Sequence, residues 1–158
     1  MGFFSKKEEE SGAPNGTPDK IERITWNPKY SVQVDVVDTQ HRELFAIMNR
    51  IADVYESGSR DLLPIMNDLV RYVTEHFHSE SMIMMKAKYP GFSDHNRQHD
   101  QFVDKVQEFL NDFRKEDEQL TYRMLIYIRD WLLSHTQQVD MQYADYLVRT
   151  GALAKVAP

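Results

Sequence analysis

The chain has 158 residues, which is an ordinary length for one domain. Hydrophobic residues make up 41% and charged residues 28%, as in globular proteins, and the formal net charge of −6 argues against a protein that binds nucleic acid through a basic face. The chain has no cysteine, so any metal site must use nitrogen and oxygen ligands. Cysteine-rich zinc sites and iron–sulfur clusters are therefore excluded.

The first part of the chain is polar. Residues 1–23 hold a charged run and a connector rich in glycine and proline, and they are predicted to form a flexible N-terminal arm. Its short apolar patch matches neither a signal peptide nor a membrane span, so a cytoplasmic location is predicted. Residues 24–37 show no helical period, and we expect an irregular segment laid across the rest of the domain.

Four stretches then show the spacing of apolar residues that is typical of a helical bundle. They cover residues 41–55, 62–83, 95–113 and 124–146. Asp38 is a plausible N-cap of the first helix and Ser93 of the third, while Gly58 and Gly151 are expected to end the first and the fourth. Short connections make neighbouring helices antiparallel. We therefore predict an all-α, up-down-up-down antiparallel four-helix bundle over residues 24–150, followed by a tail over 151–158.

Histidines and carboxylates occupy positions in these stripes where a bundle would otherwise have apolar side chains. His76 and Glu80 lie one helical turn apart on one face, and so do His95 and His99 on another helix. A lone histidine such as His41 is more often a hydrogen-bonded core residue than a ligand. Several such positions at compatible levels favour a metal site, because burying these groups unpaired would cost several kcal/mol each.

The candidate donors of the fourth helix do not have the i, i+4 spacing of the other two pairs. Five residues separate His135 from Asp140, a rotation of about 140° on an ideal helix, so the two do not share a face. Either a local π-type distortion or a carboxylate that reaches sideways would reconcile them. His78 lies two residues from His76 and is expected to point toward solvent.

Five imidazoles and two carboxylates are too many ligands for a single zinc ion, which binds four in a closed site. Two metal ions are therefore needed. The mixture of neutral imidazoles and carboxylates suits iron or manganese, and the donor types alone do not separate these two.

Taken together, these residues resemble the hemerythrin family, in particular its bacterial members. The resemblance covers about residues 26–146, and its motifs here are His76-Phe77-x-x-Glu80, Tyr89-Pro90-x-x-x-x-His95-x-x-x-His99 and Trp131-Leu132-x-x-His135-x-x-x-x-Asp140-x-x-Tyr143. Ser81 departs from the pattern, because bacterial members commonly have a second glutamate there.

The resemblance implies a cofactor of two non-heme iron ions bridged by oxide or hydroxide. His95, His99 and His135 would complete one six-coordinate iron, His41 and His76 would bind the second, and Glu80 and Asp140 would bridge both. An open position on the second iron would take dioxygen. The resemblance also implies an apolar oxygen pocket, formed by Leu44, Phe77, Trp131 and Leu132.

These implications favour a protein that binds dioxygen reversibly, for storage, delivery or sensing, over an enzyme. The alternative is a di-iron oxidase, a peroxidase or a protein that handles nitric oxide at the same centre. A purely structural metal would need its open position filled, and the sequence offers no eighth ligand. No protein partner can be inferred.

Overall fold

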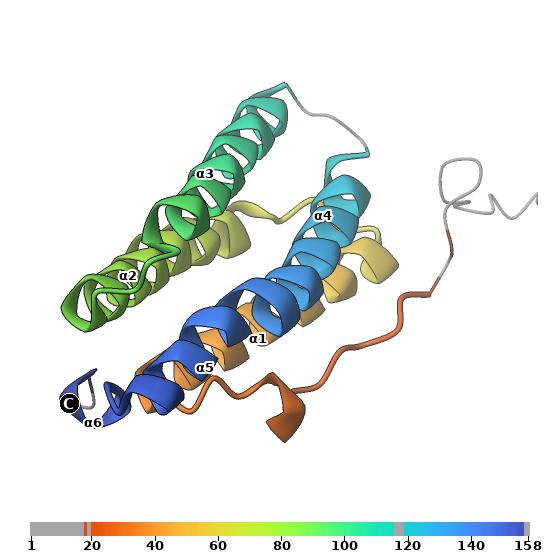
Figure 1. Ribbon diagram of the computed structural model, residues 1–158. Coiled ribbons are helices and arrows are strands. Elements are labelled where there is room, and N and C mark those ends of the chain that lie inside the picture. Colours follow the sequence, from red (N-terminus) through yellow and green to blue (C-terminus); the bar gives the residue numbers. More distant parts are fainter. Residues whose placement is uncertain (1–17, 19, 116–118, 157–158) are drawn as a thin grey trace, which may run out of the picture.

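The computed structural model describes residues 18, 20–115 and 119–156, with the side chain of residue 155 excepted. Most of the predicted N-terminal arm and part of the polar run after the third helix lie outside these residues. Four helical rods pack antiparallel, which confirms the predicted fold class (Figure 1). No helix among the described residues is long and apolar enough to span a membrane.

The first three rods are α1 (Asp35–Ser57), α2 (Leu63–Ala87) and α3 (Phe92–Arg114). The fourth rod is continuous but has three parts, which are α4 (Leu120–Ser134), a π-helical segment η2 (His135–Asp140) and α5 (Met141–Thr150). In Figure 1 the fourth rod runs along α1, while α2 lies beside α3.

Two predicted helix starts were wrong. The first helix begins at Asp35, and the carboxylate of Asp38 instead accepts the backbone N–H of Val32 at 2.8 Å and the hydroxyl of Ser31. Asp38 therefore fixes the segment before the helix rather than capping the helix itself. The third helix begins at Phe92, with Gly91 at the N-cap position, so Ser93 is already inside its first turn.

The predicted ends of the first and last rods agree with the structure. Gly58 and Gly151 follow α1 and α5 with φ angles of 66° and 68°, a left-handed conformation that glycine adopts without steric cost. The chain after Gly151 forms a short helix, α6 (Leu153–Val156), which packs against α2. The predicted tail is thus partly helical.

The segment before α1 is irregular, as expected, apart from one turn of 3-10 helix, η1 (Pro28–Tyr30). It is fastened to α1 through side chains. Asn49 accepts the N–H of Ile24 at 3.1 Å and donates to its carbonyl at 2.8 Å, and Ile21 is buried at 7% exposure. Contact with the bundle therefore begins before residue 24, and the domain boundary there stays a prediction.

The buried apolar side chains form two separate clusters along the bundle. The larger contains Leu44 of α1, Phe77 of α2 and Leu132 of α4. The smaller contains Ile83 of α2 and Tyr143 of α5. Between the two clusters each rod carries buried histidines or carboxylates instead.

Candidate metal centre

The polar layer between the two clusters consists of the seven residues that the sequence singled out. All are at most 3% exposed, and they are His41 from α1, His76 and Glu80 from α2, His95 and His99 from α3, and His135 and Asp140 from the π segment. Their donor atoms form two groups, each spanning no more than 4.8 Å.

The first group joins three imidazoles and two carboxylate oxygens. Nε2 of His99 lies 3.0 Å from Nε2 of His95 and 3.1 Å from Nε2 of His135. Glu80 Oε2 is 3.1 Å from His99 Nε2, and Asp140 Oδ1 is 3.1 Å from His135 Nε2. In an octahedral complex with bonds of about 2.1 Å, neighbouring ligand atoms lie about 3.0 Å apart. These four distances therefore match the spacing of neighbouring ligand atoms in an octahedral complex.

The second group contains His41, His76 and Glu80. Asp140 connects the two groups, because its Oδ2 lies 3.1 Å from His41 Nε2 while its Oδ1 belongs to the first group. Glu80 Oε2 lies 3.5 Å from His76 Nε2 and also contributes to the first group. Both carboxylates thus stand between the two groups of imidazoles.

The π segment explains how His135 and Asp140 reach the same site. In a π turn the hydrogen bonds run from residue i to i+5, so residues five apart come onto one face. The segment spans His135–Asp140, and both ends are buried toward the centre. Of the two arrangements that the sequence allowed, the π distortion is the one present.

Four of the donor atoms that face inward have no hydrogen-bond partner in the described part of the chain. Among the described residues, His76 Nε2, Glu80 Oε2 and both carboxylate oxygens of Asp140 are buried without a hydrogen bond. Such atoms cost free energy unless something satisfies them, and native proteins rarely leave them so. A metal ion accepts all of these lone pairs at once, so the residues present fit a metal centre.

The protonation of the site also suits a cation. Burial lowers the pKa of His76 to about 3 and lowers that of His99 as well, so both rings are neutral at neutral pH. Burial raises the pKa of Asp140, yet the neighbouring His135 and His41 rings outweigh it and hold the value at about 2. Glu80 is likewise held well below its ordinary pKa by His76, His95 and His99 in spite of its burial. Neutral imidazoles and ionised carboxylates are the forms that bind metals.

His41 differs from the other rings. Its burial opposes protonation, but the Asp140 carboxylate at 3.1 Å raises its pKa above the ordinary value. A proton on His41 therefore competes with a metal ion for the same pair of residues.

Comparison with known proteins identifies this arrangement. The family model described as the hemerythrin HHE cation binding domain matches residues 32–147. The chain belongs to the hemerythrin family.

Several relatives resemble the chain over most of their length. It is 29% identical over 126 residues to a bacteriohemerythrin of Methylococcus capsulatus, an alignment that covers 78% of this chain and 96% of that protein. It is 28% identical over 124 residues to a hemerythrin subunit of Sipunculus nudus, with 78% and 93% covered. A crystal structure of a wild-type hemerythrin superposes with a TM-score of 0.67 at 28% identity and covers 77% of this chain and 95% of that one.

Two side chains that hold donors of this hemerythrin centre were missed as functional residues. Gln40 accepts a hydrogen bond from His76 Nδ1 at 3.1 Å, and its amide nitrogen donates to Ser79 Oγ at 3.0 Å, which fixes the direction of the amide. With its proton on Nδ1, His76 presents a free lone pair on Nε2. The feature of the sequence that could have indicated this role is the position of Gln40 directly before the candidate ligand His41.

Tyr143 supports the other side of the hemerythrin site. It is completely buried, and its hydroxyl donates to Glu80 Oε1 at 2.8 Å. Only Oε2 of Glu80 then remains without a hydrogen bond among the described residues. The sequence motif contained Tyr143, but nothing in the spacing indicated which carboxylate it would contact.

Aromatic rings cover the imidazoles. Phe77 lies parallel to the His99 ring with centroids 3.8 Å apart, and Trp131 lies nearly parallel to the His135 ring at 4.2 Å. Leu44 and Leu132 are fully buried in the larger apolar cluster. His78 is exposed and outside both groups of donors, as its position on the helix indicated.

Proposed function

We propose that this chain binds dioxygen reversibly at a non-heme di-iron centre and does not catalyse a reaction. His95, His99 and His135 are assigned to one iron, His41 and His76 to the other, and Glu80 and Asp140 to the bridge between them. The observation that carries the proposal is the unequal division of imidazoles between the two groups of donors. An external ligand can bind at the group with fewer protein donors.

The choice of iron rests on the donor set and on family membership. Imidazoles and carboxylates suit iron, and membership of the hemerythrin family favours it over manganese. Ferrous ions held by these histidines and carboxylates would supply the electrons that dioxygen takes up on binding.

The ratio of donors supports binding over oxidation chemistry. Ferritin-like di-iron proteins use a carboxylate-rich set with Glu-x-x-His pairs, whereas imidazoles here outnumber carboxylates five to two. The buried, ionised carboxylates serve as bridging ligands and have no proton to donate at neutral pH.

The protein's own contribution is to keep the centre dry. Phe77 and Trp131 cover imidazole rings, and we assign Leu44 and Leu132 to the same apolar wall. A wall of this kind keeps water and protons away from the bound ligand, which can then leave as dioxygen.

The test is an absorption spectrum of the purified protein with metal analysis. The reduced protein, exposed to air, should gain a visible band that disappears when oxygen is removed, with about two irons per chain. Zinc, or a single metal ion per chain, would contradict the di-iron assignment. Release of hydrogen peroxide in place of dioxygen would favour an oxidase or peroxidase, and a stable complex formed only with nitric oxide would favour that gas as the ligand.

A further inference from the structure

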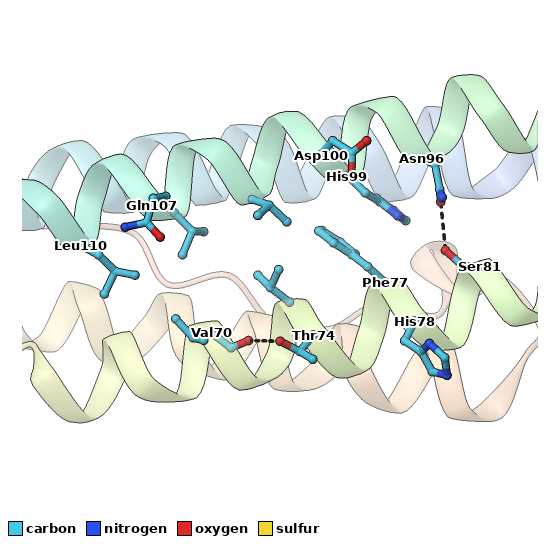
Figure 2. A pocket seen from close by; sticks show the side chains of 13 residues that line it. Val70, Thr74, Phe77, His78, Ser81, Asn96, His99, Asp100, Gln107 and Leu110 are labelled. Atoms are coloured by element: carbon cyan, nitrogen blue, oxygen red, sulfur yellow. Dashed lines mark hydrogen bonds between the residues drawn. The ribbon is translucent and has the colours of Figure 1, made fainter.

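A groove of about 390 Å³ runs along the seam between α2 and α3. Its apolar walls come from both helices (Figure 2), and they are Val70, Val73 and Phe77 on α2 and Val103, Val106 and Leu110 on α3. We call this cavity the α2–α3 groove.

The groove exists because short side chains line this seam. Four of its apolar residues are valines, which do not reach far enough to fill the space between two helix backbones. Val70 and Val103 remain 40% and 43% exposed at the rim, whereas Val73 and Val106 are buried at 8% and 4%. Thr74 turns its hydroxyl back to the Val70 carbonyl at 3.0 Å, so it places no free donor in the groove.

The inner end of the groove reaches the candidate metal centre. His99 is among its lining residues, and Figure 2 shows Phe77 pointing across the seam toward it. Beyond that point the hydroxyl of Ser81 donates to Asn96 Oδ1 at 2.9 Å and joins the two helices. Phe77, only 8% exposed, is stacked on the His99 ring and has its centroid 5.6 Å from that of the His76 ring, so it stands between the groove and both groups of donors.

Other sides of the centre are covered by buried rings. Tyr72 is 2% exposed and stacks on His76 at 4.9 Å, while Tyr143 is fully buried against Glu80. Two further surface cavities, of about 590 and 540 Å³, have none of the seven donor residues in their walls. The α2–α3 groove differs from both because it includes His99.

We propose that the α2–α3 groove is the access route by which an uncharged diatomic gas reaches the centre, and that the Phe77 ring is its movable inner wall. The inference rests on the proposed function. The lining of the groove also includes polar residues, among them His78, Asp100 and Gln107, but Val73, Val106 and Phe77 form a buried apolar part. Such an apolar surface favours small apolar solutes such as xenon over water. Water gains no hydrogen bonds from the buried valines, so the inner part of the groove favours the gas over water and ions.

The test uses tryptophan variants whose side chains fill the groove from its exposed rim. Val103→Trp places an indole over the groove, and because Val103 is 43% exposed, the fold does not depend on it. Val70→Trp fills the same space from the facing helix. The matched control is Ile126→Trp, since Ile126 lines both of the other two cavities.

The kinetic readout is the rate of dioxygen binding and release in the iron-loaded, reduced protein. A blocked route should lower both rates several-fold by the same factor and leave the affinity and iron content unchanged, because a route affects the barrier and not the end states. The control should match the wild type. Unchanged rates in both groove variants, or slowing only in Ile126→Trp, would overturn the proposal.

A second readout needs no oxygen binding. Xenon NMR of the oxidised, iron-loaded protein should show xenon in the wild type and in Ile126→Trp, and its displacement in Val103→Trp. Absence of xenon from the wild-type groove would overturn the proposal. If the wild type forms no oxygenated spectrum, the proposed function fails, and the same variants then test access with nitric oxide.

Discussion

Single residues divide into those that contribute a donor atom and those that hold a donor in place. His99 has the most central donor, because its Nε2 lies within 3.1 Å of two other imidazole nitrogens and of Glu80 Oε2. His78, on the neighbouring helix, points away from the seam in Figure 2 and is exposed. The two histidines therefore provide a matched pair for a test of the assignment.

Replacing His99 by alanine should reduce the iron content from about two ions per chain to one or fewer and lower the thermal unfolding midpoint, since metal binding contributes to folding free energy. His78→Ala should change neither quantity. Metal analysis and thermal unfolding of the two variants measure this. Equal damage from both substitutions would show that the ligands are misassigned.

Gln40 acts on the centre only through His76. Replacing Gln40 by leucine removes the acceptor for Nδ1, so the ring loses its fixed tautomer and orientation, and we expect iron affinity to fall by about 10–100-fold. Ser79→Ala removes only the outer contact to the amide and should have a smaller effect. Competition with an iron chelator measures both affinities. Identical affinities in Gln40→Leu and the wild type would show that this hydrogen bond does not support the ligand.

Leu44 tests the role of the apolar wall. It lies one turn after His41 on α1 and is fully buried. Leu44→Asn should retain the iron but speed conversion of the oxygenated protein to the ferric form by on the order of tenfold, or about 1.4 kcal/mol. The decay of the oxygenated spectrum at several pH values, beside metal analysis, provides the measurement. Decay at the wild-type rate would exclude Leu44 from the pocket.

Among the helical elements, the π segment has the most specific role. It adds one residue to the fourth rod, and so turns His135 and Asp140 to the same side. Deleting Gln138, which is exposed, would leave His135 and Asp140 four positions apart in an ordinary α-helix, where positions i and i+4 share a face. Asp140 would then stay on the side of the centre, whereas one extra alanine after Gln138 should turn it away by about 100°.

We expect the insertion to abolish binding of both irons while leaving the helical circular dichroism largely intact, and the deletion of Gln138 to retain both irons. Gln138→Ala keeps the length of the segment and is the control, with iron content expected to match the wild type. An insertion variant that still binds two irons would mean that the register of the π turn is not what positions Asp140.

The elements also show where sequence reasoning succeeded and where it did not. The helices and the i, i+4 donor pairs follow from periodicity, which depends only on local geometry. The helix starts at Asp35 and Phe92 do not, because Asp38 forms hydrogen bonds with residues before the helix, a competition that spacing cannot reveal. Likewise, the support of His76 by Gln40 joins residues 36 positions apart and depends on how two helices pack.

At the scale of the whole molecule, ion pairs fasten the irregular N-terminal segment to the bundle. Arg23 contacts Glu56 Oε1 at 2.8 Å and Asp53 Oδ1 at 2.6 Å, and Glu56 also accepts the N–H of Ile21 at 2.6 Å. The side-chain hydrogen bond from Arg23 is the largest of the effects that lower the pKa of Glu56 from 4.5 to about 2.

This lowered pKa gives a prediction with a definite sign. Because the folded pKa lies below the unfolded one, the contribution of Glu56 to stability is fully present above pH 4.5 and is lost as the pH falls toward 2. Glu56→Gln should therefore be less stable than the wild type at neutral pH, and the difference should shrink over that range. Chemical unfolding of both proteins at several pH values measures it, and a difference independent of pH would contradict the assignment.

The polar layer that separates the two apolar clusters also bears on how the chain is handled in a cell. With metal bound, ligands from all four rods make the two halves of the core unfold as one cooperative unit. Without metal, the layer keeps buried polar atoms that have no hydrogen-bond partner among the described residues, which costs free energy, and we expect the smaller cluster around Ile83 and Tyr143 to open while the larger one stays folded. A chain that has not received its iron would then expose part of its core to proteases. The lifetime of the polypeptide would follow the supply of its metal.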